Sequence, residues 1–395
     1  MRKSTILAAI FLTLVLPAST CMIAHAQSEV LPWGVERVRA HCLWDNNMDM
    51  TVDKGANAGQ GINIAIIDTG IYYWEDNWGE KHYHEDLADN VKGATAFRKV
   101  NDYAQEEDPL PDYRADGHGT HCTGIIGAVD NLIGVIGTAP RVNLYSLQMK
   151  TWDYLELVAA IDWSVDNGMN VISISFHWEN DYPAVREACE NAYENGLLLV
   201  AASGNDNDPV AYPAAYDYVV AVGAVYEDDT RWERSNYGSE LEFVAPGVDV
   251  NSTVLNNGYG LLTGTSMACP HVSATAALIW NSKIDPWYDD DEDDEWSNTE
   301  VREKLNNMTL DLGSSGKDNY YGWGLINAWA TNQRPLGDIN IDYVVNILDI
   351  TIASTAFGSY PGHPNWDPRA DINIDNIINI LDLDIIAQNF GQEDP

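Results

Sequence analysis

Four short runs of mostly aliphatic residues recur in the 395-residue chain, and polar turns bound each of them. The runs occupy residues 62–67, 170–175, 197–202 and 218–222. Two segments between them, 155–167 and 183–195, have the apolar spacing of helices. Apolar strand runs joined through helices are typical of a parallel sheet that is covered on both faces. We therefore expect an α/β fold.

The chain is strongly acidic. It has 21 basic and 60 acidic residues, which give a formal net charge of −39. Such a charge repels nucleic acid and anionic lipid and attracts cations such as calcium. Hydrophobic residues make up 45% of the chain, enough to bury a sizeable core. We expect no nucleic-acid partner.

The N-terminus has the pattern of a secretory signal. Arg2 and Lys3 precede an apolar run over 6–16, and Ala-His-Ala at 24–26 fits a cleavage site. The run is short for a membrane span, although a retained N-terminal anchor is the alternative. The sequence thus predicts a signal peptide over 1–26, secretion, and no membrane span after its removal. Four cysteines would remain, and the sequence does not choose among their three possible pairings: Cys42, Cys122, Cys189 and Cys269.

Three motifs carry an aspartate, a histidine and a serine. Asp68 begins Asp-Thr-Gly after the first apolar run, His118 lies in Asp-Gly-His-Gly-Thr-His-Cys, and Ser266 lies in Gly-Thr-Ser-Met-Ala before an apolar helix expected over 272–280. A serine nucleophile needs a neighbouring base, and histidine has a suitable pKa. A carboxylate can orient that histidine. Asn205 follows another predicted strand and could donate its amide to an oxyanion.

Each motif alone permits another interpretation. Asp-Thr-Gly can be a simple turn, and it occurs in aspartic proteases, which need a second copy that this sequence lacks. His118 and His121 have the i, i+3 spacing of a metal pair, but no third ligand stands at a known zinc spacing. Gly-Thr-Ser before a helix could be only a helix cap.

In their joint order, the motifs resemble those of the subtilase family of serine proteases. The similarity runs from Pro-Trp-Gly-Val at 32–35 to Tyr-Gly-Trp-Gly-Leu-Ile-Asn at 321–327, nearly all of residues 27–333. The resemblance implies a subtilisin-like fold and a secreted endopeptidase that acts through an acyl-enzyme. By the same resemblance, Asp68 would orient His118, the general base, Ser266 would attack the peptide carbonyl, and Asn205 would bind the oxyanion. His121 would be structural.

The resemblance also implies where a polypeptide substrate and calcium bind. The expected substrate-binding residues are Ser173, Ser175, Phe176, Ala202, Ser203 and Gly204. The family usually has two glycines where this chain has His177 and Trp178, and small pocket walls favour large apolar or aromatic side chains. The expected calcium ligands are the carbonyls of Val129, Ile133 and Val135 and the side chains of Asn131, Asp86 and Glu29. An ordinary surface loop is the alternative to this calcium site.

Subtilases normally carry an inhibitory propeptide that assists folding. Here the family-like segment begins six residues after the predicted cleavage site, which leaves no room for that domain. We therefore expect folding that is unaided, calcium-assisted or aided in trans.

An internal repeat follows Arg-Pro-Leu-Gly at 334–337. Asp-Ile-Asn-Ile-Asp begins at 338 and again 33 residues later at 371, and Asn-Ile-Leu-Asp recurs with the same offset. Both copies match the oxygen-ligand positions 1, 3, 5, 7, 9 and 12 of an EF-hand-type calcium loop. The expected ligands are Asp338, Asn340, Asp342, the Val344 carbonyl, Asn346 and Asp349, then Asp371, Asn373, Asp375, the Ile377 carbonyl, Asn379 and Asp382.

Each loop ends in aspartate and precedes one apolar helix, which resembles dockerin modules. We expect a small α-helical dockerin-like domain over 334–395 that tethers the enzyme to a cohesin-bearing protein or a cell-surface scaffold. Tyr343 and Asn376 stand where glycine is usual, and tyrosine tolerates left-handed backbone poorly, so the first loop should bind more weakly. The alternatives are an acidic tail without fixed metal, a repeat that only stabilises the protease, and a catalytically silent binding protein with the same fold.

Overall fold

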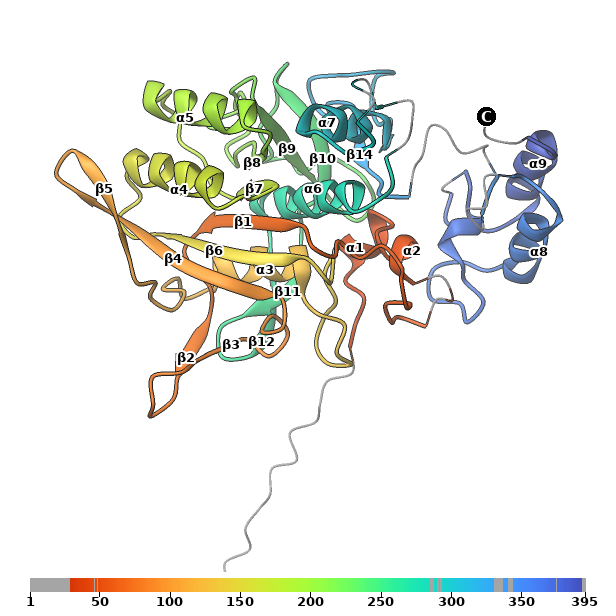
Figure 1. Ribbon diagram of the computed structural model, residues 1–395. Helices are drawn as coiled ribbons and strands as arrows, with labels where there is room; N and C mark the ends of the chain where they lie inside the picture. Colours follow the sequence, from red (N-terminus) through yellow and green to blue (C-terminus); the bar gives the residue numbers. More distant parts are fainter. Residues whose placement is uncertain are drawn as a thin grey trace, which may run out of the picture.

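The computed structural model describes residues 29–45, 47, 49–284, 288–289, 291, 293–329, 337–339, 344–373 and 375–392. The predicted signal peptide, the junction at 333/334, the ligands Asn340 and Asp342, and Tyr343 lie outside these residues. Figure 1 shows a large part built around one sheet and a smaller helical part formed by the C-terminal residues.

A ten-stranded sheet forms the centre of the larger part. Its strands are β1 (Asn63–Asp68), β4 (Val91–Val100), β5 (Tyr103–Glu107), β6 (Asn143–Met149), β7 (Val171–Ile174), β8 (Leu198–Ala202), β9 (Val219–Val225), β10 (Leu241–Pro246), β13 (Thr309–Leu310) and β14 (Leu325–Ile326). They lie in the order β13-β14-β10-β9-β8-β7-β1-β6-β4-β5. Every neighbouring pair from β14 to β4 is parallel, and both edge pairs are antiparallel.

Two antiparallel hairpins lie outside this sheet. They are β2 (Tyr73–Glu75) with β3 (Lys81–Tyr83), and β11 (Val250–Val254) with β12 (Gly258–Leu262). The sequence analysis did not predict either hairpin or the antiparallel edge strand β5.

Helices cover both faces of the sheet, as the sequence predicted. The helices of the larger part are α1 (Trp33–Arg37), α2 (His41–Trp44), α3 (His118–Gly127), α4 (Tyr154–Asp166), α5 (Pro183–Glu194), α6 (Thr265–Trp280) and α7 (Asn298–Asn307). Ile64 and Ile66 of β1 join the core under α3, α6 and α7, whereas Ala65 and Ile67 join the core under α4 and α5. Alternate side chains of a strand point to opposite faces, so both faces of this apolar run are buried.

The carboxyl ends of β1, β7 and β8 lie together at one edge of the sheet. β1 pairs with β6 on one side and with β7 on the other, so the chain order reverses at β1. Ligand sites in open parallel sheets form at such a reversal. The edge carries Asp68 at the end of β1, Ser175 after β7 and Asn205 after β8.

The C-terminal residues form a smaller part with a core of its own. Its elements are α8 (Ile347–Ala356), the 3₁₀ turn η1 (Pro368–Ala370) and α9 (Ile380–Asn389), and the core includes Val345, Ala353, Ile378 and Ile386. The two repeats exchange backbone hydrogen bonds. Gly391 N donates to Val345 O at 2.7 Å and, 33 residues earlier, Gly358 N donates to Ile378 O at 2.7 Å. Neither repeat is therefore completed without the other.

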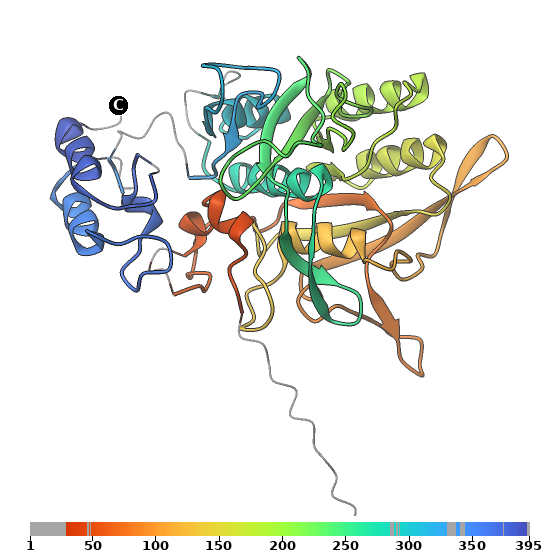
Figure 2. The same ribbon diagram turned by 180° about the vertical axis from the view of Figure 1, so that it is seen from behind.

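The smaller part contacts the larger one at the N-terminal segment. In both views, α8 and α9 lie at the end of the molecule that carries α1 and α2 (Figures 1 and 2). Arg39 Nη2 donates to the carbonyl of Asp371 at 2.8 Å and lies 3.8 Å from Asp371 Oδ2. The Arg39 side chain is buried, so this contact is part of a closed interface.

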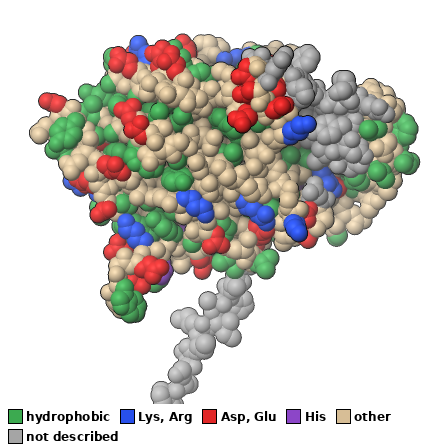
Figure 3. Space-filling model, viewed as in Figure 1, with side chains coloured by type: hydrophobic (Ala, Val, Ile, Leu, Met, Phe, Trp, Pro, Cys, Tyr) green, Lys and Arg blue, Asp and Glu red, His purple; other side chains and the backbone are tan. Residues whose placement is uncertain are grey.

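The described part of the chain has an acidic surface and unpaired cysteines. Acidic side chains are spread over the face shown in Figure 3, among fewer basic ones. The four cysteines of the described residues are buried free thiols. In the described part of the chain, no helix has the length and hydropathy needed to cross a bilayer.

Candidate active site

A buried carboxylate, a histidine and a serine meet at the edge of the sheet. Asp68 is 1% exposed, and His118 Nδ1 donates to its Oδ1 at 2.8 Å. Because a carboxylate only accepts, this contact assigns the proton to Nδ1 and leaves Nε2 as the basic nitrogen. Ser266 stands in the first turn of α6, and its hydroxyl donates to Ser175 O at 2.7 Å.

Cys122 lies behind the histidine and the serine. Its Sγ donates to Ser266 O at 3.4 Å and lies 4.0 Å from His118 Nδ1. Burial raises the pKa of Cys122, so its thiol stays neutral. The predicted triad residues are thus brought together around a buried thiol that adds no charge.

Pro270 explains how the serine carbonyl is held. The helix α6 begins at Thr265, seven residues before the start expected from the sequence, and it contains Pro270. A proline has no N–H to donate to the carbonyl four residues earlier, which is that of Ser266. Ser175 Oγ donates to this carbonyl instead, at 3.0 Å, together with the Cys122 thiol. The nucleophile is therefore fixed to β7 and α3 as well as to its own helix.

A network that the sequence analysis missed positions the histidine. Asp112 is buried and accepts hydrogen bonds from Thr69 Oγ1 at 2.8 Å and from Thr120 N and Oγ1 at 3.0 and 2.7 Å. Thr69 Oγ1 in turn accepts from Gly119 N at 2.9 Å. This network joins the end of β1 to the first turn of α3. Asp112 lies in no motif, so only the tertiary structure reveals it.

The environment of His118 favours its charged form. Burial lowers the pKa of His118, but the charge and the hydrogen bond of Asp68, together with the neighbouring Cys122, outweigh burial and raise that pKa well above its ordinary value. A raised pKa makes this imidazole a stronger base towards a serine proton. The two other buried histidines of the region differ, since burial lowers the pKa of both His121 and His271 to about 4. His121 Nε2 bonds to the Val250 carbonyl at 2.9 Å, which agrees with a structural role.

Asn205 and the backbone of Ser266 border one small space. Asn205 Oδ1 accepts from Thr265 N and Thr265 Oγ1, both at 2.9 Å, so its amide nitrogen is left to donate elsewhere. A Cβ placed on Gly264 would lie 3.5 Å from Asn205 Nδ2 and 3.7 Å from Ser266 N. Two N–H donors therefore face a space that glycine keeps open. This arrangement suits a developing oxyanion.

The expected substrate-binding residues fall into two groups. Ser175 and Phe176 follow β7, and Ala202, Ser203 and Gly204 form the end of β8 and the turn after it. Ser173 instead lies within β7, where its Oγ accepts a hydrogen bond from Ser273 Oγ of α6 at 2.9 Å. Its side chain faces the core and is therefore a poor candidate for substrate contact.

The expected calcium loop of the larger part folds around Asp86. Asp86 Oδ2 accepts from Val135 N at 2.9 Å, Val129 N donates to Asp86 O at 2.9 Å, and Ile133 N donates to Asn131 Oδ1 at 3.0 Å. Glu29 Oε1 accepts from Asn131 N at 3.0 Å. All six expected ligand residues thus lie in one hydrogen-bonded cluster.

The Asp86 carboxyl tests whether calcium fits this cluster. Its Oδ1 is buried and makes no hydrogen bond of ordinary length, and burial raises its pKa to about 7. Calcium prefers oxygen ligands, and a cation at Oδ1 would stabilise the ionised carboxylate. The residues present therefore fit a calcium ion.

The second C-terminal loop brings its acidic residues together. Carboxylate oxygens of Asp371, Asp375 and Asp382 all lie within 4.8 Å of one another. Asp382 also closes the loop, since its Oδ1 accepts from Ile372 N at 2.8 Å and its Oδ2 accepts from Asn379 N at 2.8 Å. Asn373 Nδ2 donates to Asp375 Oδ2 at 3.0 Å, and Asn379 Nδ2 donates to Ile377 O at 3.0 Å. This donor set fits a hard cation.

In the second loop, asparagine occupies the position where glycine is usual, and it adopts the backbone conformation required there. Asn376 has φ +64°, the left-handed conformation that asparagine adopts more readily than most residues. In the first loop, Asp349 repeats the pattern of Asp382, with Oδ1 accepting from Ile339 N at 2.7 Å and Oδ2 accepting from Asn346 N at 2.8 Å. Asp338 is also buried, and Val344 stands at position 7.

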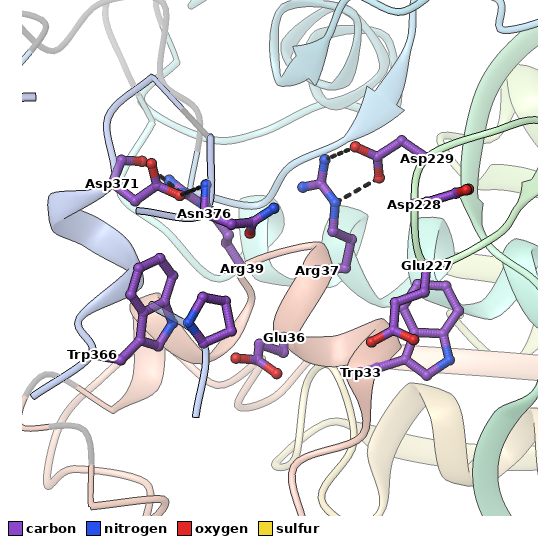
Figure 4. Close-up of a pocket in the computed structure, with 11 residues that line it drawn as sticks. Trp33, Glu36, Arg37, Arg39, Glu227, Asp228, Asp229, Trp366, Asp371 and Asn376 are labelled. Carbon is purple, nitrogen blue, oxygen red and sulfur yellow. Dashed lines mark hydrogen bonds and ion pairs between the residues drawn. The ribbon is translucent and has the colours of Figure 1, made fainter. Parts of the chain in front are cut away.

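A cavity of about 530 Å³ lies between the two parts (Figure 4). Its lining includes Trp33 and Glu36 from α1 and Trp366 and Asp371 from the smaller part. Arg37 forms a bidentate contact with Asp229 at 2.6 and 2.7 Å. No triad residue lines this cavity, so we assign it to the interface and not to catalysis.

The chain is similar to known proteins over its larger part. A model of the subtilase family matches residues 59–324. Subtilisin BL from Lederbergia lenta is 35% identical over 311 residues, which cover 78% of this chain and 100% of that protein. Subtilisin NAT from Bacillus subtilis subsp. natto is 33% identical over 320 residues, 79% of this chain and 74% of that protein. The minor extracellular protease Epr from Bacillus subtilis is 36% identical over 300 residues, 74% of this chain and 40% of that protein.

The charge of Asp68 should control the pH dependence of activity. Neutral His118 is the active base, so kcat/KM should rise with pH with an apparent pKa above about 6.5, the value of an ordinary histidine. In Asp68→Asn, the rise of kcat/KM with pH should occur at lower pH, and kcat should fall on the order of 10⁴-fold. Initial rates measured between pH 5 and about 10 test this. A limb that stays in place in Asp68→Asn would assign the titration to another group.

Loss of the Asn205 amide should slow the chemical step. We expect Asn205→Ala to lower kcat by about 10²–10³ and to leave KM nearly unchanged, because the donor acts mainly on the transition state. Asp208→Asn, an exposed neighbour in the same loop, serves as the control and should behave like the unmodified protein. Steady-state kinetics on one peptide substrate measure both. An equal rise in KM would instead indicate a role in ground-state binding.

Proposed function

This chain belongs to the subtilase family and is a subtilisin-like serine endopeptidase, and we propose that Asp68, His118 and Ser266, with Asn205, carry out its reaction outside the cell. The observation that carries this assignment is the buried Asp68–His118 contact, which Cys122 joins to the carbonyl of Ser266. We also propose the boundaries 27–333 for the peptidase and 334–395 for a calcium-binding tether. The similarity to a protein called an extracellular protease supports the location.

In the proposed reaction, His118 first accepts a proton and then donates it, in both the acylation and the deacylation half. His118 Nε2 takes the proton of the Ser266 hydroxyl as Oγ attacks the carbonyl carbon of the peptide, and the carbonyl oxygen becomes an oxyanion. Asn205 Nδ2 and Ser266 N donate to that oxyanion. His118 then gives its proton to the leaving amine, which yields an acyl-enzyme. Water repeats the sequence with His118 as base and releases the acid product.

Calcium has a structural part in this proposal. Bound at the Asp86 cluster or at the C-terminal loops, it would neutralise carboxylates that are crowded in the folded chain. Asp86 supports this because burial opposes its charge, and Asp382 supports it because three carboxylates meet at its loop. The net charge of −39 makes such neutralisation favourable for folding.

The tether proposal rests on duplicated exposed side chains. Ile347 and Leu348 begin α8, and Ile380 and Leu381 stand at the equivalent positions of α9. Each of the four is more than half exposed, from 54% for Leu348 to 66% for Ile380. Paired apolar side chains at the surface favour contact with a partner protein. We infer that these pairs, held by the calcium loops before them, bind a cohesin-type domain of a scaffold.

Covalent labelling and cleavage test the enzyme. With calcium present, a fluorophosphonate should label the protein at Ser266, and a peptide library should be cleaved; Ser266→Ala should lose the label and at least about 10³-fold of the rate. Mass spectrometry locates the label. Folded protein that is neither labelled nor active would favour the silent binding protein instead.

Capture on immobilised cohesin-type domains tests the tether. Capture should require calcium and should be lost when Leu348→Asp and Leu381→Asp are combined, since both apolar pairs then carry a charge. Asp384→Asn changes an exposed residue of α9 and should be captured normally. Circular dichroism of the full chain shows whether the variants stay folded. Undiminished capture of the double variant, or failure of every cohesin type to capture the unmodified chain, argues for a repeat that only stabilises the protease.

A further inference from the structure

A side-chain contact joins the two segments that flank the expected primary subsite. Strands β7 and β8 are neighbours, and their last paired residues are Ile174 and Ala201. Beyond that pair the chain continues as 175–178 on one side and 203–206 on the other. His177 Nε2 lies 3.2 Å from Asp206 Oδ2 and connects the two segments.

Backbone hydrogen bonds close the far end of the same region. Trp178 N donates to Tyr212 O at 2.7 Å, and Tyr212 N donates to Trp178 O at 3.0 Å. Ala211 N donates to Ser203 O at 2.9 Å and ties this turn to the end of β8. The region is therefore bounded by the β7–β8 ladder at one end and by the Trp178–Tyr212 pair at the other.

Both partners of the side-chain contact stand on firmly held backbone. Asp206 N donates to Asn236 Oδ1 at 2.9 Å. His177 lies between Phe176 and Trp178, whose rings pack edge-to-face with centroids 5.2 Å apart. The two side chains are only partly enclosed, since His177 is 23% and Asp206 is 51% exposed.

The contact lies next to the reacting groups along both chains. Asp206 directly follows Asn205, the proposed oxyanion donor. His177 follows Ser175, whose carbonyl accepts the Ser266 hydroxyl, by two residues. A substrate side chain that enters between the two segments must therefore pass the His177–Asp206 pair.

We propose that His177 and Asp206 form a strap across the entrance of the primary subsite and make the enzyme select small side chains before the scissile bond. The proposal rests on the proposed function, because it uses the same serine and the same substrate-binding segments. It reverses the preference for large apolar or aromatic side chains that the resemblance implies. The reason is local: the imidazole of His177 stands where family members usually have a glycine, and Asp206 of the facing segment holds it there.

Only a substrate with a large side chain before the scissile bond has to open the strap, so only its binding loses the free energy of the His177–Asp206 contact. A hydrogen bond between two partly exposed side chains is weak, so the strap can open, but opening it separates His177 from Asp206 and moves the imidazole. An alanine side chain avoids this cost, whereas a phenylalanine side chain does not. Steric selection in such subsites changes kcat/KM by about 10–200-fold, and we expect a preference on the order of tenfold.

Two peptides that differ only in alanine or phenylalanine before the scissile bond test the strap. For the unmodified protein, kcat/KM should be about tenfold higher for the alanine peptide. In His177→Ala, the phenylalanine-to-alanine ratio of kcat/KM should rise about tenfold. In Asp206→Asn it should rise about threefold, because the shape remains and the carboxylate acceptor is lost. Glu179→Ala removes an exposed charge from the same segment and should leave the ratio unchanged.

The double variant His177→Ala with Asp206→Asn gives a further check. Its ratio should equal that of His177→Ala within about twofold, because the contact is already absent in the single variant. An unchanged ratio in His177→Ala, or a preference of the unmodified protein for phenylalanine, overturns the strap. Labelling of Ser266 by a fluorophosphonate in each variant separates this result from failure of the proposed function, which would abolish labelling in the unmodified protein as well.

Discussion

The hydrogen bond between Asp68 and His118 is the interaction on which the active site depends. A carboxylate that is 1% exposed is costly unless a partner stabilises its charge, and here the partner is an imidazole at the start of α3. The sheet makes this placement possible, because β1 ends at the point where its neighbours β6 and β7 lead in opposite directions. Everything added around the pair restrains it: the Asp112 network fixes α3, and the carbonyl freed by Pro270 ties Ser266 to Ser175 and Cys122.

Residues that lie in local motifs could be predicted, and residues that act through distant contacts could not. The apolar runs located β1, β7 and β8 to within one residue and β9 to within three, and the motifs located the triad. Asp112 was missed because an isolated aspartate in a loop has no distinguishing pattern. The start of α6 was placed too late because a proline usually interrupts a helix. Here α6 continues through Pro270, and the carbonyl of Ser266, which lacks its helical donor, accepts from Ser175 and Cys122 instead. The His177–Asp206 contact depends on two loops whose approach no spacing in the sequence indicates.

Acidic groups in this chain are organised in two ways. Most are spread over the surface, where water solvates them, but a few are gathered where the backbone donates to them. Asp86, Asp349 and Asp382 each accept backbone N–H groups while being almost completely buried. The backbone donors orient the carboxylates that a cation would use in these loops. A few of the acidic groups thus fix the backbone of the loops that contain them, and the others are solvated at the surface.

The contact of Arg39 with Asp371 has a consequence for how the protein is made. Its partners are 332 residues apart, and Arg39 is held with φ +56°, a conformation that side-chain-bearing residues rarely adopt. During synthesis Arg39 leaves the ribosome 332 residues before Asp371, so this contact can form only after the whole peptidase part has been made. The N-terminal segment and the second C-terminal loop are therefore joined late, although the first of them is made early.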